Sequence, residues 1–165
     1  MSGLPALNQE DESLFAKALK DFLSRSKAHR ALLLDQAGYI IHQAGRNPEL
    51  DTDSFAALTS NAFNAIDAID ALSECLQETD FKILHQRGSV HQTGIFRIDE
   101  SCLLVAVVSA DIPFSALEDA AAITVAQIAE HLKRTRDRTP EVSIDIADHD
   151  PASVKGFLFN RKPSD

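Results

Sequence analysis

Seven consecutive apolar residues, Cys102 to Val108 (CLLVAVV), constrain the fold more than any other stretch of the chain. A strand that alternates apolar and polar residues has one dry face, whereas a strand without alternation needs cover on both faces. Ala31 to Leu34 form a second run of this kind. We therefore expect both runs in the middle of one sheet that has helices on both sides, an α/β (α+β) arrangement.

The length and composition are those of a single folded domain. The chain has 165 residues, of which 44% are hydrophobic and 25% charged, as is usual for a chain that buries a core. A net charge of −9 argues against nucleic acid or an anionic membrane as partner, because binding phosphates needs clustered Lys and Arg. Cys75 and Cys102 lie in apolar patterns, which predicts buried reduced thiols. The N-terminus lacks the basic and apolar regions of a signal peptide, so we expect a cytoplasmic protein.

The stretch from Asp51 to Glu78 predicts a long helix. Short oxygens from Asp51 to Ser54 can cap its first turn. Its apolar residues recur at spacings of three and four, which places them on one helical stripe that we expect to lie on the sheet. The stripe comprises Phe55, Leu58, Ala62, Ile66, Ile69, Leu72 and Leu76.

Phe63 falls outside that stripe, on a second side of the same helix with Ala56, Thr59 and Ser60. We expect Phe63 to be exposed in an isolated monomer. Two apolar sides predict that helix Ser54–Glu78 also contacts a second subunit or a partner. The alternative is a surface helix with one stray exposed aromatic residue, since scattered exposed apolar residues are common.

The remaining pattern predicts two further helices and three further strands. Hairpins join the first strand to the second, the third to the fourth and the fourth to the fifth. Gly38 suits the left-handed position of the first hairpin loop. A mostly antiparallel five-stranded sheet of order 2-1-5-4-3 satisfies these links, with the long helix on one face and the other two helices on the opposite face. The additional elements are a helix through Leu14–Phe22, strands Tyr39–Gln43, Phe81–Gln86 and Val90–Ile98, and a helix opened by a capping box at Ser115–Glu118.

The strand Phe81–Gln86 would be an open edge beside the long helix. An uncovered edge with apolar residues invites pairing with another chain, and a two-fold dimer would use edge and helix together. We predict a dimer or partner interface from this juxtaposition. Its residues are Ser54, Phe55, Leu58, Thr59, Ala62, Phe63, Ile66, Asp67, Phe81, Ile83 and His85.

The two ends of the chain differ from the middle. We expect a flexible N-terminus over residues 1–12, one domain over residues 13–138 and a polar C-terminal tail over residues 139–165. The tail contains one apolar cluster, Phe157, Leu158 and Phe159. This cluster either folds back on its own domain or docks on a partner.

Two segments of the chain resemble the roadblock/dynein light chain family. One is LLLDQAGYIIHQAG followed by DTDSFAALTSNAFNAIDAI, and the other is CLLVAVV followed by a short loop and an amphipathic helix. The D-x-x-G hairpin, the Ala-Gly ending and the DTxSxAxLT helix start are similar to the bacterial MglB regulators in particular. The resemblance spans roughly Ser13 to Arg138, and it implies a profilin-like three-layer sandwich.

The resemblance also implies a function. Such proteins are homodimers that bind Ras-like small GTPases and act as co-activators of hydrolysis or nucleotide exchange, with the long helices and central strands forming the platform. The chain departs from the MglB pattern at Ser115–Glu118, where those proteins have a Gly-Leu-Val-Arg-type stretch. Two alternatives stay open: an assembly scaffold that binds no GTPase, and a PAS- or GAF-type sensor, which needs a concave pocket with convergent polar groups.

Catalytic signatures are missing from the sequence. It contains no G-x-x-x-x-G-K-[ST], G-x-S-x-G, H-E-x-x-H or C-x-x-C, so we expect no catalytic residue, no cofactor and no metal site, and a protein that is not an enzyme. Arg46, Arg87 and Arg97 have the loop or strand positions an arginine finger would need. Each is more typical of a solvated surface residue. We expect any effect on a GTPase to come from repositioning the GTPase's own groups.

Overall fold

The computed structural model describes residues 3–72 and 82–138, without the side chains of Ile66 and residues 69–72. Several sequence predictions lie outside this range: Phe81, the end of the long helix beyond Leu72, and the tail cluster Phe157, Leu158 and Phe159. Within it, no helix combines the length and apolarity needed to cross a membrane.

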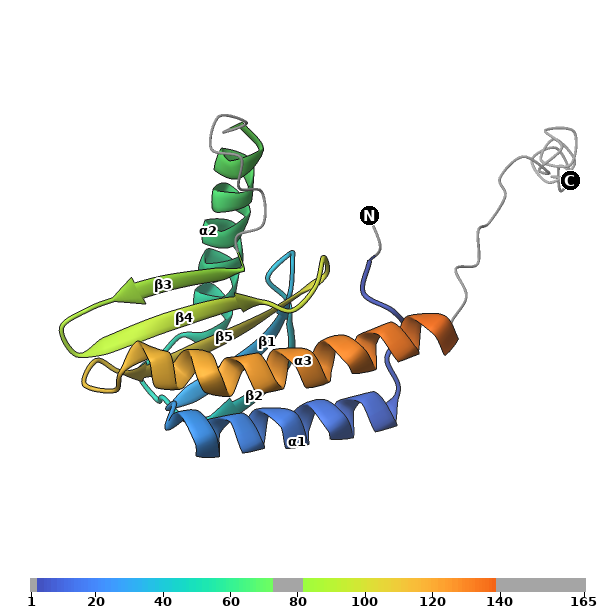
Figure 1. Ribbon diagram of the computed structural model, residues 1–165, viewed down its shortest axis with the longest axis horizontal. Helices are drawn as coiled ribbons and strands as arrows, with labels where there is room; N and C mark the ends of the chain where they lie inside the picture. The colour runs from blue at the N-terminus through green and yellow to red at the C-terminus, as the bar shows by residue number, and fades with distance from the viewer. Residues whose placement is uncertain (1–2, 73–81, 139–165) are drawn as a thin grey trace, which may run out of the picture.

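One antiparallel sheet organises the molecule, and its strand order is β2-β1-β5-β4-β3, as predicted. Helix α2 covers one face, while α1 and α3 lie side by side over the other (Figure 1). The fold class expected from the sequence is thereby confirmed. The elements in chain order are α1 (Gln9–Ser26), β1 (Arg30–Asp35), β2 (Ile40–Gly45), α2 (Thr52–Leu72), β3 (Ile83–Arg87), β4 (His91–Arg97), β5 (Cys102–Ser109) and α3 (Phe114–Arg138).

The two continuous apolar runs are the central strands β1 and β5. Alternate residues of each run enter opposite cores: Leu33 and Leu104 pack with α1 and α3, whereas Leu32 and Leu103 pack with α2. Both strands are therefore buried on both faces, which is why neither alternates. Cys102 lies inside the larger core, where burial raises the pKa of its thiol to about 12.

Helix α1 begins earlier than the sequence pattern suggested. Asn8 is its N-cap: the Asn8 side chain accepts from the backbone N–H groups of Glu10 and Asp11, and the Asn8 N–H donates to Asp11 at 2.7 Å. This reciprocal capping starts the helix at Gln9, so the domain boundary expected at Ser13 falls inside α1. Helix α3 begins at Phe114, which places Ser115 within the first turn instead of at the cap.

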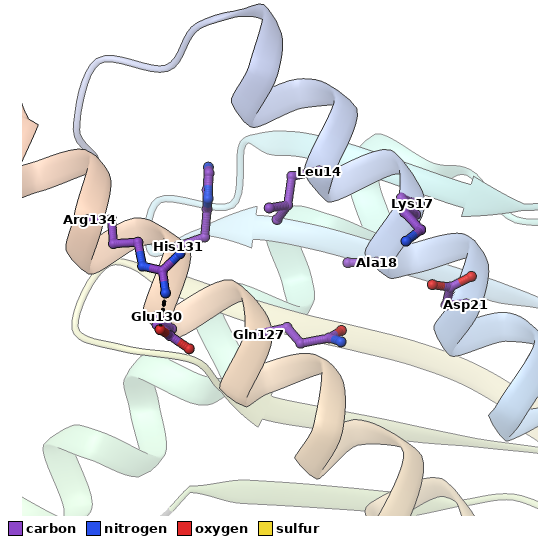
Figure 2. A pocket seen from close by; sticks show the side chains of 8 residues that line it. All are labelled: Leu14, Lys17, Ala18, Asp21, Gln127, Glu130, His131 and Arg134. Atoms are coloured by element: carbon purple, nitrogen blue, oxygen red, sulfur yellow. Dashed lines mark hydrogen bonds and ion pairs between the residues drawn. The ribbon is translucent and has the colours of Figure 1, made fainter.

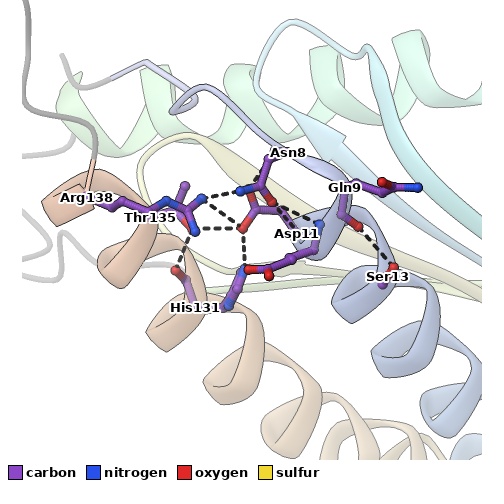
Figure 3. Close-up of polar contacts among 8 residues, drawn as sticks. Asn8, Gln9, Asp11, Ser13, His131, Thr135 and Arg138 are labelled. Atoms are coloured by element: carbon purple, nitrogen blue, oxygen red, sulfur yellow. Dashed lines mark hydrogen bonds and ion pairs between the residues drawn. The ribbon is translucent and has the colours of Figure 1, made fainter.

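A buried carboxylate ties the start of α1 to the end of α3. Asp11 has no exposed side-chain surface, and it accepts from His131 Nε2 at 2.6 Å, Thr135 Oγ1 at 3.2 Å and Arg138 at 3.0 Å (Figure 3). Burial alone would raise the pKa of Asp11, but the hydrogen bonds from Asn8, His131 and Thr135 and the charge of Arg138 hold it below its ordinary value. Asp11 therefore stays ionised and fixes the end of α3 from which residues 139–165 continue.

Candidate interaction surface

The β1–β2 hairpin sets the orientation of α2. Gly38 has a φ of +91°, and a Cβ placed on it would lie 3.0 Å from the Cα of Ala57 and 3.3 Å from the Cβ of Ser60. Only glycine suits both the left-handed backbone and this close approach. Ser60 Oγ and Asn64 Nδ2 donate to the carbonyl of Gln36, the latter at 3.1 Å. These contacts fix which side of α2 faces the sheet.

The Ala-Gly ending of β2 has a similar explanation. Gly45 has a φ of +83°, and a Cβ there would lie 2.2 Å from the carbonyl oxygen of His29. Arg30 at the start of β1 donates to the Gly45 carbonyl at 2.6 Å. The glycine thus lets the end of β2 lie directly against the entry of β1, and both glycines of the sequence motif are required by packing.

The side of α2 that faces the sheet is made of small residues and one aromatic ring. Ala56, Thr59 and Ser60 are buried, and Phe63 is 3% exposed. Phe63 packs in the hydrophobic core between α2 and the sheet. The guanidinium of Arg97 lies 4.7 Å from the centroid of the Phe63 ring. The expectation that Phe63 is exposed was therefore wrong. Small side chains at positions 56, 59 and 60 bring the helix close to the sheet, which leaves the ring of Phe63 inside.

The opposite side of α2 carries the predicted apolar stripe, turned toward solvent. Leu58 is 68% exposed, Ala62 and Ala65 are exposed, and Phe55 is half-buried. We call Phe55, Leu58, Ala62 and Ala65 the outer α2 stripe. Its expected contact with the sheet was wrong for Leu58 and Ala62, because the Gly38 hairpin and the Ser60 hydroxyl select the small-residue side. Leu58, Ala62 and Ala65 are left without cover from the described residues, whereas Phe55 packs partly against the core under α2.

Strand β3 is the open border of the sheet. It pairs with β4 from Ile83↔Phe96 to Arg87↔Gln92, and no described strand lies along its other side. Ile83 is 44% exposed. A row of free backbone donors and acceptors next to an exposed isoleucine is a template for pairing with another strand.

His85 points to the α3 side of this border. Its ring stacks on Phe114 with 3.6 Å between centroids, and its Nε2 lies 2.9 Å from Gln92 Oε1. The Gln92 amide nitrogen donates to the carbonyls of Ser109 and Ile112, so Oε1 is the acceptor and His85 Nε2 carries the proton. His85 thus braces the loop before α3, away from α2.

The other residues of the predicted interface divide into two groups. Ser54 is exposed, and its hydroxyl donates to Asp51 at 2.6 Å, whereas Asp67 is engaged by Arg97. Thr59 is buried under the helix with Phe63, so neither is accessible to a partner. Leu58 and Ala62 lie on the exposed surface of α2, whereas Phe55 is half-buried against the core under the helix. Sequence reasoning missed Ala65 and the pairing of Arg97 with Asp67.

Two of the three arginines considered for a finger are engaged within the fold. Arg97 contacts Asp67 and Phe63, and Arg87 donates to the carbonyl of Ala110 at 3.3 Å. Arg46 is exposed. Among the described residues, no group of three or more His, Cys, Asp or Glu is placed to hold a metal ion.

Two surface hollows bear on the sensor alternative. One, of about 240 Å³, lies between α1 and α3 and is lined by charges of both signs, including Lys17, Asp21, Glu130 and Arg134 (Figure 2). The other, of about 130 Å³, lies between β3 and α3 beside Ile83 and Val125. Ligand pockets typically measure about 300–1,000 Å³. Neither hollow reaches that size.

Comparison with known proteins gives structural matches only. No family model and no curated protein sequence matches the chain. A solved MglB with a tetrameric arrangement is similar over 82% of this chain and 99% of its own, with a TM-score of 0.72 and 19% identity. The gliding protein MglB from Thermus thermophilus is similar over 81% of this chain and 99% of its own, with a TM-score of 0.70 and 20% identity.

A third solved structure, with a lower TM-score, is a Roadblock/LC7 domain. The Roadblock/LC7 domain from Streptomyces avermitilis is similar over 74% of this chain and 97% of its own, with a TM-score of 0.57 and 14% identity. The chain therefore has the roadblock/LC7 fold in its MglB-like form.

Proposed function

We propose that the protein is a homodimeric platform that binds a cytoplasmic Ras-like small GTPase and modulates its nucleotide cycle. The observation that carries this proposal is the outer α2 stripe on the same molecule as the open β3 edge, in an MglB-like fold. The motif resemblance of the hairpin and the start of α2 supplies the class of partner. A neighbour described as having a tetrameric arrangement supports self-association of this fold.

The open edge offers the contact for a second copy. Antiparallel pairing of two β3 strands requires a two-fold axis perpendicular to the sheet, which keeps α2 of both copies on one face. Ile83, next to the hollow beside α3, would be covered by such pairing. Stable interfaces bury about 1,200–2,000 Å² in total, so the platform needs the neighbouring side of α2 as well as the strand.

The proposed action on the GTPase needs no catalytic group from this chain. Arg97 is held by Asp67 and stacked on Phe63, and Arg87 is bonded to a backbone carbonyl. An arginine finger supplied in trans accelerates hydrolysis by about 10³–10⁵. We assign the effect to ordering of the GTPase's own catalytic loops on the platform, and we expect a smaller acceleration.

A capture experiment tests the proposal. The full-length protein is immobilised and exposed to native lysate containing either GDP or a non-hydrolysable GTP analogue, and the captured GTPase is then assayed for hydrolysis and exchange. We expect capture that depends on the nucleotide and a changed rate in solution. Equal capture in both nucleotide states without any rate effect would overturn the proposal, and partners without a nucleotide-binding protein would favour the assembly scaffold.

Two variants sharpen the capture experiment. Leu58→Asp adds a charge to the outer α2 stripe, and Ile123→Asp adds the same charge to a 47% exposed position on α3, in the opposite layer. We expect only Leu58→Asp to lose the GTPase.

A third variant tests the tail by replacing Phe157, Leu158 and Phe159 with serine in the full chain. If the tail docks on a partner, the replacement lowers capture. If the tail docks on its own domain, the replacement lowers the stability of the protein.

A further inference from the structure

The smaller of the two surface hollows lies at the open border of the sheet. We call it the β3–α3 hollow. Its volume is about 130 Å³, its exposed lining is almost entirely apolar, and it is lined mainly by Ile83 of β3, Phe96 of β4, and Ala121, Ala122 and Val125 of α3. A dry apolar cavity of about 150 Å³ takes up one benzene molecule. The hollow therefore has the size of one aromatic side chain.

The strand edge beside the hollow can accept an extended peptide. Ile83 lines the hollow and His85 stacks on Phe114, so both residues face α3. Leu84 between them packs in the core under α2. No described strand lies along the outer side of β3. A peptide that adds to a sheet edge gains backbone hydrogen bonds, and pockets for its alternate side chains give specificity. The edge and the hollow together have this form.

The C-terminal tail carries a segment with matching side chains. Phe157, Leu158 and Phe159 are the only three consecutive large apolar residues between positions 139 and 165, and the tail has no other Phe, Tyr or Trp. The two phenylalanines are two positions apart. In an extended segment both rings therefore lie on the same side, and Leu158 lies on the other.

The length of the intervening chain matches the distance to the hollow. Helix α3 ends at Arg138, which is bonded to Asp11, and Gly156 is 18 positions further on. Val125 and Ala121 lie 13 and 17 positions back along α3, or about 20–26 Å at a rise of 1.5 Å per residue. A flexible chain of about 18 residues has an r.m.s. end-to-end distance of about 21–25 Å. The effective concentration of a tethered group is highest when these two lengths agree.

The other exposed surfaces suit the tail less well. The groove between α1 and α3 is close to the end of α3, but a ring buried there would desolvate charged groups, since the groove is lined by Lys17, Asp21, Glu130 and Arg134. Leu58 of the outer α2 stripe belongs to the opposite face of the sheet from α3 (Figure 1). The β3–α3 hollow is apolar and belongs to the same layer as α3.

We propose that the tail docks on its own domain, with the ring of Phe157 or Phe159 in the β3–α3 hollow and the segment along the β3 edge. The docking needs neither a GTPase nor a second copy. It has one consequence, which rests on the β3 pairing of the proposed function. A docked tail covers Ile83 and the edge, so two copies pair only after both tails have left. The tail thereby sets the concentration at which the platform assembles.

The expected effect is moderate. Burying one aromatic ring and closing a loop of about 18 residues have free energies of similar size and opposite sign, so docked and free tails should be comparably populated. An affinity falls by the fraction of molecules that are competent to bind. If each tail is docked about half of the time, the requirement for two free tails raises the Kd of the dimer about fourfold.

Protease protection of the tail tests the docking. The full-length protein is treated with chymotrypsin at concentrations at which light scattering shows one copy, and cleavage after Phe157 and Phe159 is followed by mass spectrometry. Cleavage proceeds through the free tail, so its rate reports the free fraction. We expect about half the rate of a peptide of residues 139–165. Equal rates for the protein and the peptide would overturn the docking.

A matched pair of variants locates the docking site. Ala122→Phe fills the β3–α3 hollow from an exposed position on α3, and Ala126→Phe adds the same ring to an exposed alanine outside the hollow. We expect the first to speed cleavage about twofold and the second to leave it unchanged. Circular dichroism checks that both variants are folded, and Val125→Phe fills the hollow from a neighbouring position if Ala122→Phe is not. Equal effects inside and outside the hollow would overturn the assignment.

Dilution measured by light scattering tests the competition with a second copy. Replacing the tail cluster Phe157, Leu158 and Phe159 with serine should lower the Kd of the dimer about fourfold. The control replaces three other apolar residues of the tail with serine and should leave the Kd unchanged; these are Val142, Ile144 and Ile146. Raising the concentration of the unmodified protein should speed cleavage of the tail, because pairing displaces it. Protection that grows with concentration would mean docking on a second copy and would overturn the inference.

The outcomes separate this inference from the proposed function. A protected tail on a protein that neither dimerises nor binds a GTPase retains the docking and removes the platform. A dimer whose monomer is cleaved as fast as the free peptide does the reverse. A protected tail whose replacement leaves the Kd of the dimer unchanged overturns the competition at β3.

Discussion

Gly38 and Ala57 lie so close that a single added Cβ on the glycine would come within 3.0 Å of the alanine Cα. This contact presses the β1–β2 turn onto α2 and decides which side of the helix meets the sheet. The apolar stripe is exposed as a consequence. The exposure of the surface that we propose for a partner therefore depends on a glycine that belongs to a different element.

Replacing Gly38 by alanine should destabilise the protein. The left-handed backbone costs an L side chain about 1–2 kcal/mol, and the added methyl group also meets Ala57 and Ser60. We expect a loss of about 2–3 kcal/mol in the free energy of unfolding, measured by urea denaturation followed by circular dichroism. Gly3→Ala, which adds a Cβ with no heavy atom within 4 Å, is the control; equal stability of the two variants would contradict the role of the contact.

Phe63 and Leu58 should respond in opposite ways. Phe63→Ala removes a buried ring and leaves a cavity under Arg97, so we expect a loss of about 3–5 kcal/mol in thermal or urea unfolding. Leu58→Ala should change stability by no more than about 0.5 kcal/mol, because its side chain is mostly solvated. A destabilised Leu58→Ala beside a stable Phe63→Ala would mean that α2 faces the sheet with its other side.

This reversal shows what periodicity can and cannot predict. The continuous runs at Ala31–Leu34 and Cys102–Val108 were enough to place the central strands, and the hairpin links then fixed the sheet order. Spacing also identified the apolar stripe of α2. It could not say which of two apolar sides faces inward, because that depends on contacts from the Gly38 turn and Gln36, which are distant in the sequence.

The hydrogen-bonded cluster around Asp11 could not be predicted from the sequence, again because its members are distant along the chain. Its partners His131 and Arg138 are 120 and 127 residues away along the chain, and each alone resembles an ordinary surface charge. Exposure could be predicted where it followed from the helix itself, as for Ser54. It could not be predicted where tertiary packing buries the side chain, as for Thr59 and Phe63.

The stability of the α1–α3 layer should fall in acid through Asp11. Its folded-state pKa is lower than its ordinary value of about 3.9, so its stabilisation is complete above that pH and is lost as the pH falls through the folded-state pKa. Asp11→Asn should lower the free energy of unfolding by roughly 1–3 kcal/mol at neutral pH. It should also reduce the loss of stability between neutral and low pH, which we call the acid limb of the stability curve. Urea midpoints measured from about pH 2 to 7 check this.

Glu12→Gln is the control for the acid limb. Glu12 is the exposed neighbour of Asp11 in the first turn of α1, and its replacement should leave both the neutral stability and its pH dependence close to those of the unmodified chain. If Asp11→Asn retains the same acid limb as Glu12→Gln, the cluster does not hold α1 to α3.

The mass of the full-length protein in solution, measured by size-exclusion chromatography with light scattering, tests the platform most directly. We predict two copies for the unmodified chain and for Val90→Lys at the exposed β3–β4 turn, and one copy for Ile83→Lys, because a charge on an open edge opposes strand pairing. A single copy of the unmodified chain at every concentration, or a dimer that Ile83→Lys leaves intact, would contradict pairing at β3.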